Sequence, residues 1–230
     1  MEKLVYISGA SGQIGKSIRG YISRKNIKTI VLSRTGIDLY NNESFLKYNL
    51  GDNIKPILGN FEHIFIHLAH SFDDKTENGI DINTSALKNI KENFRSTKNK
   101  KIIFISTPDI DNKNVTTYVH SKKKSEKVLN INKDLIIRPS WVHSSDGANK
   151  ILLKFKSFYI PIPKNNNRLA PMHLSSFSKA LFNLVFNENR TGIFLFLGKE
   201  NLTFKEYLKE YHNIRSFFLP KILFNLANSL

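Results

Sequence analysis

The strongest constraint on the fold is a strand-to-helix pattern in residues 4–18, which read LVYISGASGQIGKSI. An apolar, β-branched run, Leu4–Ile7, stops at Gly9, and glycines recur at Gly12 and Gly15 before a helical spacing of isoleucines. The pattern predicts a β-strand, a tight turn and the start of an α-helix. With a second strand after that helix, it predicts an α/β fold with a parallel sheet.

The glycines of this turn match what a bound pyrophosphate requires of a backbone. A pyrophosphate can rest on a helix N-terminus only where no Cβ atom keeps the preceding backbone away from it. In the dinucleotide-binding pattern three glycines serve the turn, the close approach and the packing of helix on strand. The spacing here is G-x-x-G-x-x-G, so an ordinary strand–helix turn stays the alternative. The residues expected at the cofactor phosphates are Gly9, Ser11, Gly12, Gln13, Ile14 and Gly15.

Length and composition limit the classes of protein that this chain can belong to. Its 230 residues suffice for one good core, or for a nucleotide-binding domain with a small appendage. The first three residues lead directly into a predicted strand, which favours a cytoplasmic protein. The lack of cysteine excludes disulfides and thiolate metal sites. The net charge of +16 comes from scattered lysines, so no nucleic-acid partner is expected, although phosphorylated ligands would be attracted.

The end of the second predicted strand bears on the choice of cofactor. After a helix expected over about residues 13–24, the run Lys28–Leu32 predicts a second parallel strand and completes a βαβ unit. NAD-binding units carry an acidic residue near this strand end, whereas this chain carries Ser33 and Arg34. A hydroxyl and a guanidinium suit a 2′-phosphate, which favours NADP, with an exposed loop arginine as the alternative. Asp38, a little further on, keeps NAD open.

Two more strands are predicted over residues 45–50 and 63–69. A cofactor would pass over the small residues that end the second of them. His67 and His70 have no suitably spaced third ligand, so structural histidines are expected and no metal site. The strand-end residues expected at the cofactor are Leu68 and Ala69.

A helix and a fifth strand follow. The helical period of residues 81–94 and the apolar run 101–105 predict these two elements. The strand ends in Ser106 and Thr107, at the edge where open α/β sheets bind their ligands. One of these hydroxyls is therefore expected to orient a substrate oxygen.

Tyr118 and Lys122 lie four residues apart in a predicted helix and therefore share one face. If that face borders a nicotinamide ring, the ammonium would stabilise a phenolate and lower the phenol pKa from its ordinary value of about 10. The phenol could then act as an acid or base near neutral pH. The same spacing occurs by chance in many helices, so the interpretation depends on its place after the fifth strand.

The order of these signals resembles the short-chain dehydrogenase/reductase superfamily, and more closely its extended branch of sugar-nucleotide epimerases, dehydratases and reductases. The resemblance implies a Rossmann-like doubly wound parallel sheet, with an NAD(P)-binding domain over residues 1–146. A reduced substrate-binding region over 147–230 would be partly interleaved with the sheet, since residues 193–197 are expected to return to it. The matching pieces are residues 8–15, 50–52 and 66–69, Asn83, Ser106-Thr107, Tyr118 with Lys122, and 138–140.

The same resemblance assigns roles to individual side chains. Tyr118 would be the catalytic acid or base, and Lys122 would also bind the nicotinamide ribose. Thr107, in preference to Ser106, would bind the reacting sugar oxygen. Asn83 would have a supporting role, and Pro139 would contact the cofactor.

Residues 147–174 resemble, more narrowly, the substrate region of O-antigen and capsule sugar-nucleotide C4-reductases and C4-epimerases. The likeness implies substrate-binding roles for Asn149 and Arg168, with Arg168 near the nucleotide diphosphate or, alternatively, a surface loop charge. Thr107 is followed by Pro108-Asp109 in place of the Asp-Glu pair of the dehydratases, which speaks against dehydration. The short interval before Tyr118 and the end at Leu230 predict a reduced substrate lid.

The last segment, residues 216–227, is apolar, aromatic and basic at once. It predicts a packed terminal helix or an oligomer contact, such as that of a homodimer, with a helix on the inner membrane surface as the alternative. Taken together, the sequence predicts an NAD(P)-dependent reductase or epimerase that acts at C4 of a nucleotide sugar in surface polysaccharide synthesis. The alternatives are a non-catalytic NADP-binding sensor or partner protein and a reductase of small carbonyls.

Overall fold

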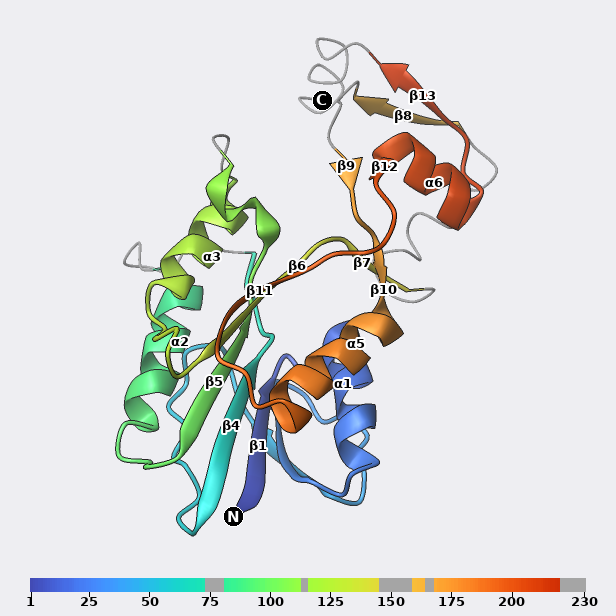
Figure 1. The fold of residues 1–230 in the computed structure, drawn as a ribbon. Helices are drawn as coiled ribbons and strands as arrows, with labels where there is room; N and C mark the ends of the chain where they lie inside the picture. Colours follow the sequence, from blue (N-terminus) through green and yellow to red (C-terminus); the bar gives the residue numbers. More distant parts are fainter. Residues whose placement is uncertain (73–80, 113–115, 145–158, 164–167, 220–230) are drawn as a thin grey trace. The chain divides into compact units, whose positions relative to one another are not determined.

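The computed structural model describes residues 1–72, 81–112, 116–144, 159–163 and 168–219 (Figure 1). The chain forms two compact units. Met1–Pro139 and Ser175–Phe196 make the first, and Ser140–Leu174 and Leu197–Leu230 make the second. The chain therefore leaves the first unit after Pro139, a few residues before the predicted division at residue 146, and later returns to it.

A seven-stranded parallel sheet forms the centre of the first unit. Its strand order is β11-β6-β5-β4-β1-β2-β3, and every pair of neighbours is parallel. The order reverses at β1, as in the predicted doubly wound Rossmann-like sheet, and the predicted return of the chain through β11 is confirmed. The strands are β1 (Glu2–Ser8), β2 (Lys28–Ser33), β3 (Glu43–Lys47), β4 (Phe61–His67), β5 (Lys100–Ile105), β6 (Leu135–Pro139) and β11 (Gly192–Phe196).

Helices cover both faces of this sheet (Figure 1). One face carries α1 (Gln13–Ser23) and α5 (Leu174–Phe182), and the other carries α2 (Ile82–Asn93) and α3 (Thr117–Glu126). Strands that are buried on both faces need apolar side chains at successive positions, which explains the unbroken apolar runs of the sequence. The core on the α2 side includes Leu4, Tyr6, Leu32, Phe65, Leu87, Ile90, Phe94 and Phe104.

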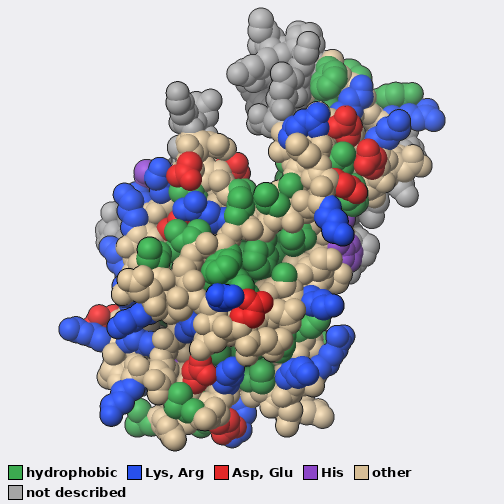
Figure 2. All heavy atoms as spheres, in the orientation of Figure 1, with side chains coloured by type: hydrophobic (Ala, Val, Ile, Leu, Met, Phe, Trp, Pro, Cys, Tyr) green, Lys and Arg blue, Asp and Glu red, His purple; other side chains and the backbone are tan. Residues whose placement is uncertain are grey.

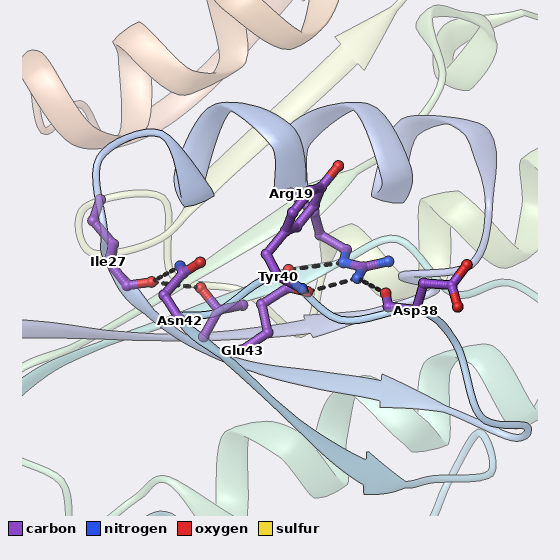
Figure 3. A network of polar contacts seen from close by, with 7 residues as sticks. Arg19, Ile27, Asp38, Tyr40, Asn42 and Glu43 are labelled. Carbon is purple, nitrogen blue, oxygen red and sulfur yellow. Dashed lines mark hydrogen bonds and ion pairs between the residues drawn. The ribbon is translucent and has the colours of Figure 1, made fainter.

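The crossover from β2 to β3, residues 34–42, contains no helix and is held by a buried ion pair (Figure 3). Arg19 of α1 donates through Nε and Nη2 to the two carboxylate oxygens of Glu43, at 2.8 and 2.6 Å. Arg19 Nη2 also donates to the carbonyl oxygen of Asp38, and Glu43 accepts from the backbone nitrogen of Tyr40. Because these extra bonds satisfy further donors and acceptors of the pair, the attraction can offset the desolvation of two buried charges. The crossover is thereby fixed to α1 and to the start of β3.

Short strands and one helix make up the described part of the second unit. Three two-stranded sheets pair β10 with β7, β12 with β9, and β13 with β8. Thr203 and Glu206 form a capping box at the start of α6, and the helix ends at Asn213, whose φ is +52°. The elements are β7 (Val142–His143), β8 (Ile160–Pro163), β9 (Arg168–Leu169), β10 (Met172–His173), β12 (Leu202–Thr203), α6 (Phe204–His212) and β13 (Ser216–Leu219).

The predicted terminal helix over residues 216–227 is wrong for residues 216–219. These residues form β13 and pair with β8 in parallel register. A four-residue apolar run is compatible with a strand or with a buried helical turn, and the pairing with β8 decides for the strand. Residues 220–227 lie outside the described part of the chain. In that part, no helix has both the length and the apolar character needed to cross a membrane.

Candidate active site

The glycine turn after β1 is closely surrounded by backbone. Gly9 has a φ of +70°, and a Cβ atom there would lie 2.7 Å from the backbone nitrogen of Ala69. At Gly15 a Cβ atom would lie 2.4 Å from the carbonyl oxygen of Gly9. Gly12 differs, because its Cβ atom would meet only that same oxygen, at 3.3 Å, and because Gly12 lines a groove. Two glycines are thus required by the fold, and the third leaves space at the groove.

Helix α1 begins at this turn without a side-chain cap. Gly12 is its N-cap residue, and its first turn contains no acidic residue. By contrast, the side chains of Asp81, Thr116 and Thr203 accept backbone N–H groups at the starts of α2, α3 and α6. The positive end of the α1 dipole is therefore not neutralised by the protein's own side chains. This arrangement fits the phosphates of a dinucleotide.

A groove of about 980 Å³ extends from the glycine turn along the carboxyl ends of β1, β2 and β4. This is the point of the sheet at which the strand order reverses, where open α/β sheets bind their ligands. Its volume is typical of a ligand-binding pocket. Of the residues predicted at the cofactor, the groove is lined by Gly9, Ser11, Gly12, Ser33, Arg34, Leu68 and Ala69, and it is also lined by Thr35, Asn49, His70, Ser71 and Phe72.

The side chains at the end of β2 give this part of the groove a positive character. Arg34 is exposed and, among the described residues, has no hydrogen bond or ion pair. Asp38 does not line the groove, and its carbonyl oxygen is held by Arg19 at 2.6 Å. The acidic residue that kept NAD open is therefore placed away from the groove wall, whereas Ser33 and Arg34 lie on it.

Tyr118 and Lys122 share one face of α3, as predicted. The Lys122 ammonium nitrogen lies 5.6 Å from the centroid of the Tyr118 ring, and it donates to the carbonyl oxygen of Ile105 at 2.7 Å. Burial lowers the pKa of Lys122 to about 8, although the carboxylate of Glu126 opposes this. The ammonium is thus held at the end of β5, against the phenol ring.

The pKa of Tyr118 is raised, so the predicted lowering is wrong. Burial is the main cause, and the negative charge of Asp109 adds to it. Lys122 donates to the Ile105 carbonyl and faces the phenol ring, so its charge does not outweigh these effects. A phenol with a raised pKa keeps its proton at neutral pH and can donate it.

The two hydroxyls at the end of β5 have different surroundings. Thr107 caps a short 3₁₀ helix, η1 (Pro108–Asp111), where its Oγ1 accepts from the backbone nitrogen of Asp109 at 3.4 Å and donates to the Asp109 carboxylate at 3.3 Å. Ser106 Oγ is buried and, in the described part of the chain, has no hydrogen-bond partner. A buried hydroxyl without a partner is available to a ligand. The structure therefore keeps both hydroxyls as candidates.

His67 and His70 follow each other closely in sequence but differ in their surroundings. His67 is fully buried, its Nδ1 lies 2.8 Å from Ser8 Oγ, and burial lowers its pKa to about 3. His70 lines the groove, and its ring meets the Tyr118 ring edge to face, with centroids 4.8 Å apart. Sequence reasoning gave His70 no functional role; the available signal was its position directly after Ala69. Among the described residues, no three metal-ligating side chains gather at one point.

Two residues at the start of α2 support this end of the groove. The Asp81 carboxylate caps α2 and accepts from Ser121 Oγ of α3 at 3.1 Å. Burial alone would raise the Asp81 pKa, but hydrogen bonds from Thr84, Ser121 and the backbone lower it overall. The Asn83 side chain bonds both backbone groups of Ser71, at 2.8 and 3.0 Å, and so holds the segment after β4.

The other predicted site residues, among them Tyr118, Lys122, Ser106 and Thr107, do not line the groove. Gln13, Ile14 and Gly15 form the first turn of α1, and Pro139 ends β6. Arg168 belongs to the second unit, where its Nη1 donates to the carbonyl oxygen of Asn201 at 2.5 Å. Asn149 lies outside the described residues. The roles of these residues toward cofactor and substrate stay predictions.

Lysine and arginine side chains are dispersed over the face shown in Figure 2. A second groove, of about 680 Å³, lies between the outer sides of α2 and α3 and is lined mainly by basic side chains. Several of these are already bonded: Lys91 donates to the carbonyl oxygen of Val128, and Lys100 to that of Arg95. The basic residues are Lys88, Lys91, Arg95, Lys100, Lys124 and Lys127.

No protein-family model matches the chain, and no curated protein sequence matches it. Solved structures match it in fold. A human epimerase family protein with NADPH has a TM-score of 0.72 and 12% identity, covering 96% of this chain and 84% of that chain. A hypothetical dTDP-4-dehydrorhamnose reductase from Sulfolobus tokodaii has a TM-score of 0.71 and 21% identity, covering 95% of this chain and 86% of that chain. The UDP-glucose 4-epimerase of Thermus thermophilus, in complex with NAD, has a TM-score of 0.67 and 16% identity, covering 94% of this chain and 86% of that chain.

These likenesses define the class of fold. The chain has the Rossmann-like fold of these epimerases and of the hypothetical reductase, and it covers most of the length of each structure compared. The fold implied by the sequence resemblance is therefore confirmed.

Proposed function

We propose that this chain is an NAD(P)-dependent oxidoreductase that reduces the C4 carbonyl of a nucleotide sugar. The observation that carries the proposal is a single groove with two distinct ends. It begins at the uncapped helix after Gly12 and reaches His70 and Phe72, whose rings contact Tyr118, with Lys122 held 5.6 Å from that ring. Structures with this fold include a UDP-glucose 4-epimerase and a dTDP-4-dehydrorhamnose reductase, which supports the nucleotide-sugar class.

The groove residues fit a nicotinamide dinucleotide. The backbone at Gly12 and the positive end of α1 would hold the pyrophosphate. By the family resemblance Lys122, which does not itself line the groove, would bind the nicotinamide ribose. Ser33 and Arg34 would hold a 2′-phosphate, which favours NADP over NAD. When bound, this cofactor supplies or accepts a hydride.

The chemistry assigned to the side chains follows from their protonation states. Tyr118 is protonated at neutral pH, so it would donate its proton to the substrate's carbonyl oxygen as the carbonyl is reduced to an alcohol. The Lys122 ammonium stabilises the phenolate that remains. A hydroxyl of Ser106 or Thr107 donates to the same oxygen. A C4-epimerase, whose reaction begins with an oxidation, stays the alternative to the reductase.

The finer parts of the proposal rest on the sequence likeness. The C4 position and a role in surface polysaccharide synthesis come from the resemblance of residues 147–174 to C4-reductases and C4-epimerases. In the same interpretation Arg168 lies near the nucleotide diphosphate of the substrate, and Asn149 is a further substrate-binding residue.

A reduction assay with a matched variant tests the proposal. Wild-type protein is incubated with NADPH or NADH and a panel of UDP- and dTDP-linked 4-keto sugars, and loss of the reduced-nicotinamide absorbance is followed. We expect Tyr118→Phe to lower kcat by about 10²–10⁴-fold, because it removes the proton donor, and to leave NADPH affinity unchanged. Phenylalanine keeps the ring that contacts His70 and Phe72, which makes it the suitable variant.

Two results would contradict the proposed reaction. Full turnover by Tyr118→Phe would remove the phenol from the mechanism. Binding of NADPH without binding or turnover of any nucleotide sugar would instead favour the non-catalytic sensor, and calorimetry distinguishes these cases.

A further inference from the structure

The segment after β4 is fixed on both sides of His70. Before it, Ala69 lies so close to Gly9 that a single Cβ atom on Gly9 would approach its backbone nitrogen to 2.7 Å. After it, the Asn83 side chain bonds the backbone nitrogen and the backbone oxygen of Ser71. The backbone of His70 is therefore held between two tightly packed neighbours.

The side chain of His70 is fixed by aromatic contacts. Its ring centroid lies 4.8 Å from that of Tyr118 and 5.2 Å from that of Phe72, both at angles near perpendicular. Phe72 stacks on Tyr118 with centroids 5.7 Å apart, although 83% of Phe72 is exposed. The three rings form one wall beside the phenol, and we call it the Tyr118 wall.

One polar atom of the Tyr118 wall has no partner. Among the described residues, His70 Nε2 is buried and makes no hydrogen bond. Buried polar atoms in proteins are nearly always paired, so an unpaired one beside a ligand groove points to a bond that the ligand completes. His70 is one of the residues that line the groove, which places Nε2 close to a ligand bound there.

His70 has the protonation state that suits a hydroxyl partner. Burial, together with the positive charge of Lys122, lowers its pKa to about 4, while Asp81 opposes the shift. The imidazole is therefore neutral at neutral pH, with one nitrogen that donates and one that accepts. A sugar hydroxyl can satisfy either tautomer, because it both donates and accepts.

We propose that His70 is a substrate-binding residue whose Nε2 bonds a sugar hydroxyl next to the carbonyl that Tyr118 protonates. This inference rests on the proposed function for the class of substrate. His70 packs against the ring whose hydroxyl serves the reacting oxygen, whereas the phosphates of the cofactor belong at Gly12, at the other end of the groove. The bond selects nucleotide sugars that carry a hydroxyl at that position.

Two variants separate the hydrogen bond from the packing. His70→Phe keeps a ring against Tyr118 but removes Nε2, and His70→Gln places an amide where Nε2 lies. We expect His70→Phe to raise the KM of a 4-keto sugar nucleotide about tenfold, with a smaller change in kcat, and His70→Gln to recover most of the loss. The melting temperature and the NADPH dissociation constant are expected to stay at wild-type values in both variants.

A binding measurement keeps this inference separate from the proposed reaction. UDP-glucose and dTDP-glucose carry a hydroxyl at C4, so with NADPH present they bind without reacting, and calorimetry gives their dissociation constants. Weaker binding to His70→Phe, with recovery in His70→Gln, supports the inference even if no 4-keto sugar is turned over. Equal binding by wild type and His70→Phe overturns the inference while leaving the reaction intact. If His70→Phe changes the affinity for NADPH as much as the affinity for the sugar, His70 contacts the cofactor and the inference is overturned. If the wild-type protein binds no nucleotide sugar, both proposals are overturned.

Discussion

The two ends of the groove are built from different parts of the chain. At one end, where we propose that the cofactor phosphates bind and which we call the phosphate end, the protein presents backbone, with a glycine turn and a helix that has neither a capping side chain nor an acidic first turn. The other end, which we call the catalytic end after the role proposed for Tyr118, is lined by His70, whose ring packs against Tyr118 near the buried Lys122. Burial displaces the pKa values of these three side chains. In the proposed function, phosphate binding thus depends on the absence of side-chain atoms, and proton transfer depends on side chains that are partly or fully buried.

At the phosphate end, the largest effect on stability is expected from adding a side-chain atom at Gly15. In Gly15→Ala the new Cβ atom would lie 2.4 Å from the Gly9 carbonyl oxygen, and neither backbone can move without shifting β1 or α1. We expect the free energy of unfolding to fall by about 3 kcal/mol, measured by urea unfolding. A loss too small to measure would contradict this account of the turn.

Gly12→Ala is the matched control for that experiment. Its Cβ atom would meet only the Gly9 oxygen at 3.3 Å, and its φ of −72° suits any residue, so the free energy of unfolding should change little. Because Gly12 lines the groove, the methyl group should instead weaken NADPH binding in a titration. Equal stability losses in the two variants would show that the fold needs both positions alike.

The catalytic end should reveal itself in the pH dependence of stability. The pKa of Lys122 is about 8 in the folded protein, below its ordinary value of 10.5, so between these values the unfolded state holds more protons. The free energy of unfolding should therefore rise with pH in this window, by about 2 kcal/mol between pH 8 and pH 10. In Lys122→Met this contribution should vanish, and urea unfolding of both proteins across the window measures the difference. Parallel pH profiles would mean that Lys122 is not desolvated.

Local patterns in the sequence were sufficient to predict the first unit. The apolar runs before Gly9 and Ser106 predict strands that are buried on both faces, and the structure confirms both. The glycine spacing predicts the turn, because such a turn needs residues without a Cβ atom at individual positions, and these positions can be recognised in the sequence. Tyr118 and Lys122 share a helix face because the helical period alone places them there.

Contacts between distant residues could not be predicted in this way. The Arg19–Glu43 ion pair joins residues 24 positions apart, and nothing in the local pattern of either residue requires it. The raised pKa of Tyr118 depends on burial and on Asp109, which a helix pattern does not reveal. In the second unit, strands such as β7 and β9 have two residues each, too few to show a period. The contact of His70 with Tyr118 and its unpaired Nε2 are also long-range features, which its position after Ala69 does not reveal.

Arg34 is a side chain at an end of the groove that is otherwise formed mainly by backbone. Of these substitutions, its replacement is expected to have the smallest effect. It is the basic side chain of the groove lining, it lies at the end of β2, and among the described residues nothing competes for its guanidinium. Because a 2′-phosphate would gain a charge-assisted hydrogen bond there, we expect Arg34→Ala to weaken NADPH binding about tenfold and to leave NADH binding unchanged. Fluorescence titration with both cofactors measures the ratio, and Arg24→Ala, which removes an exposed charge at the far end of α1, controls for general electrostatic attraction. An equal loss for both cofactors would mean that Arg34 attracts the pyrophosphate, and the preference for NADP would then lose its structural basis.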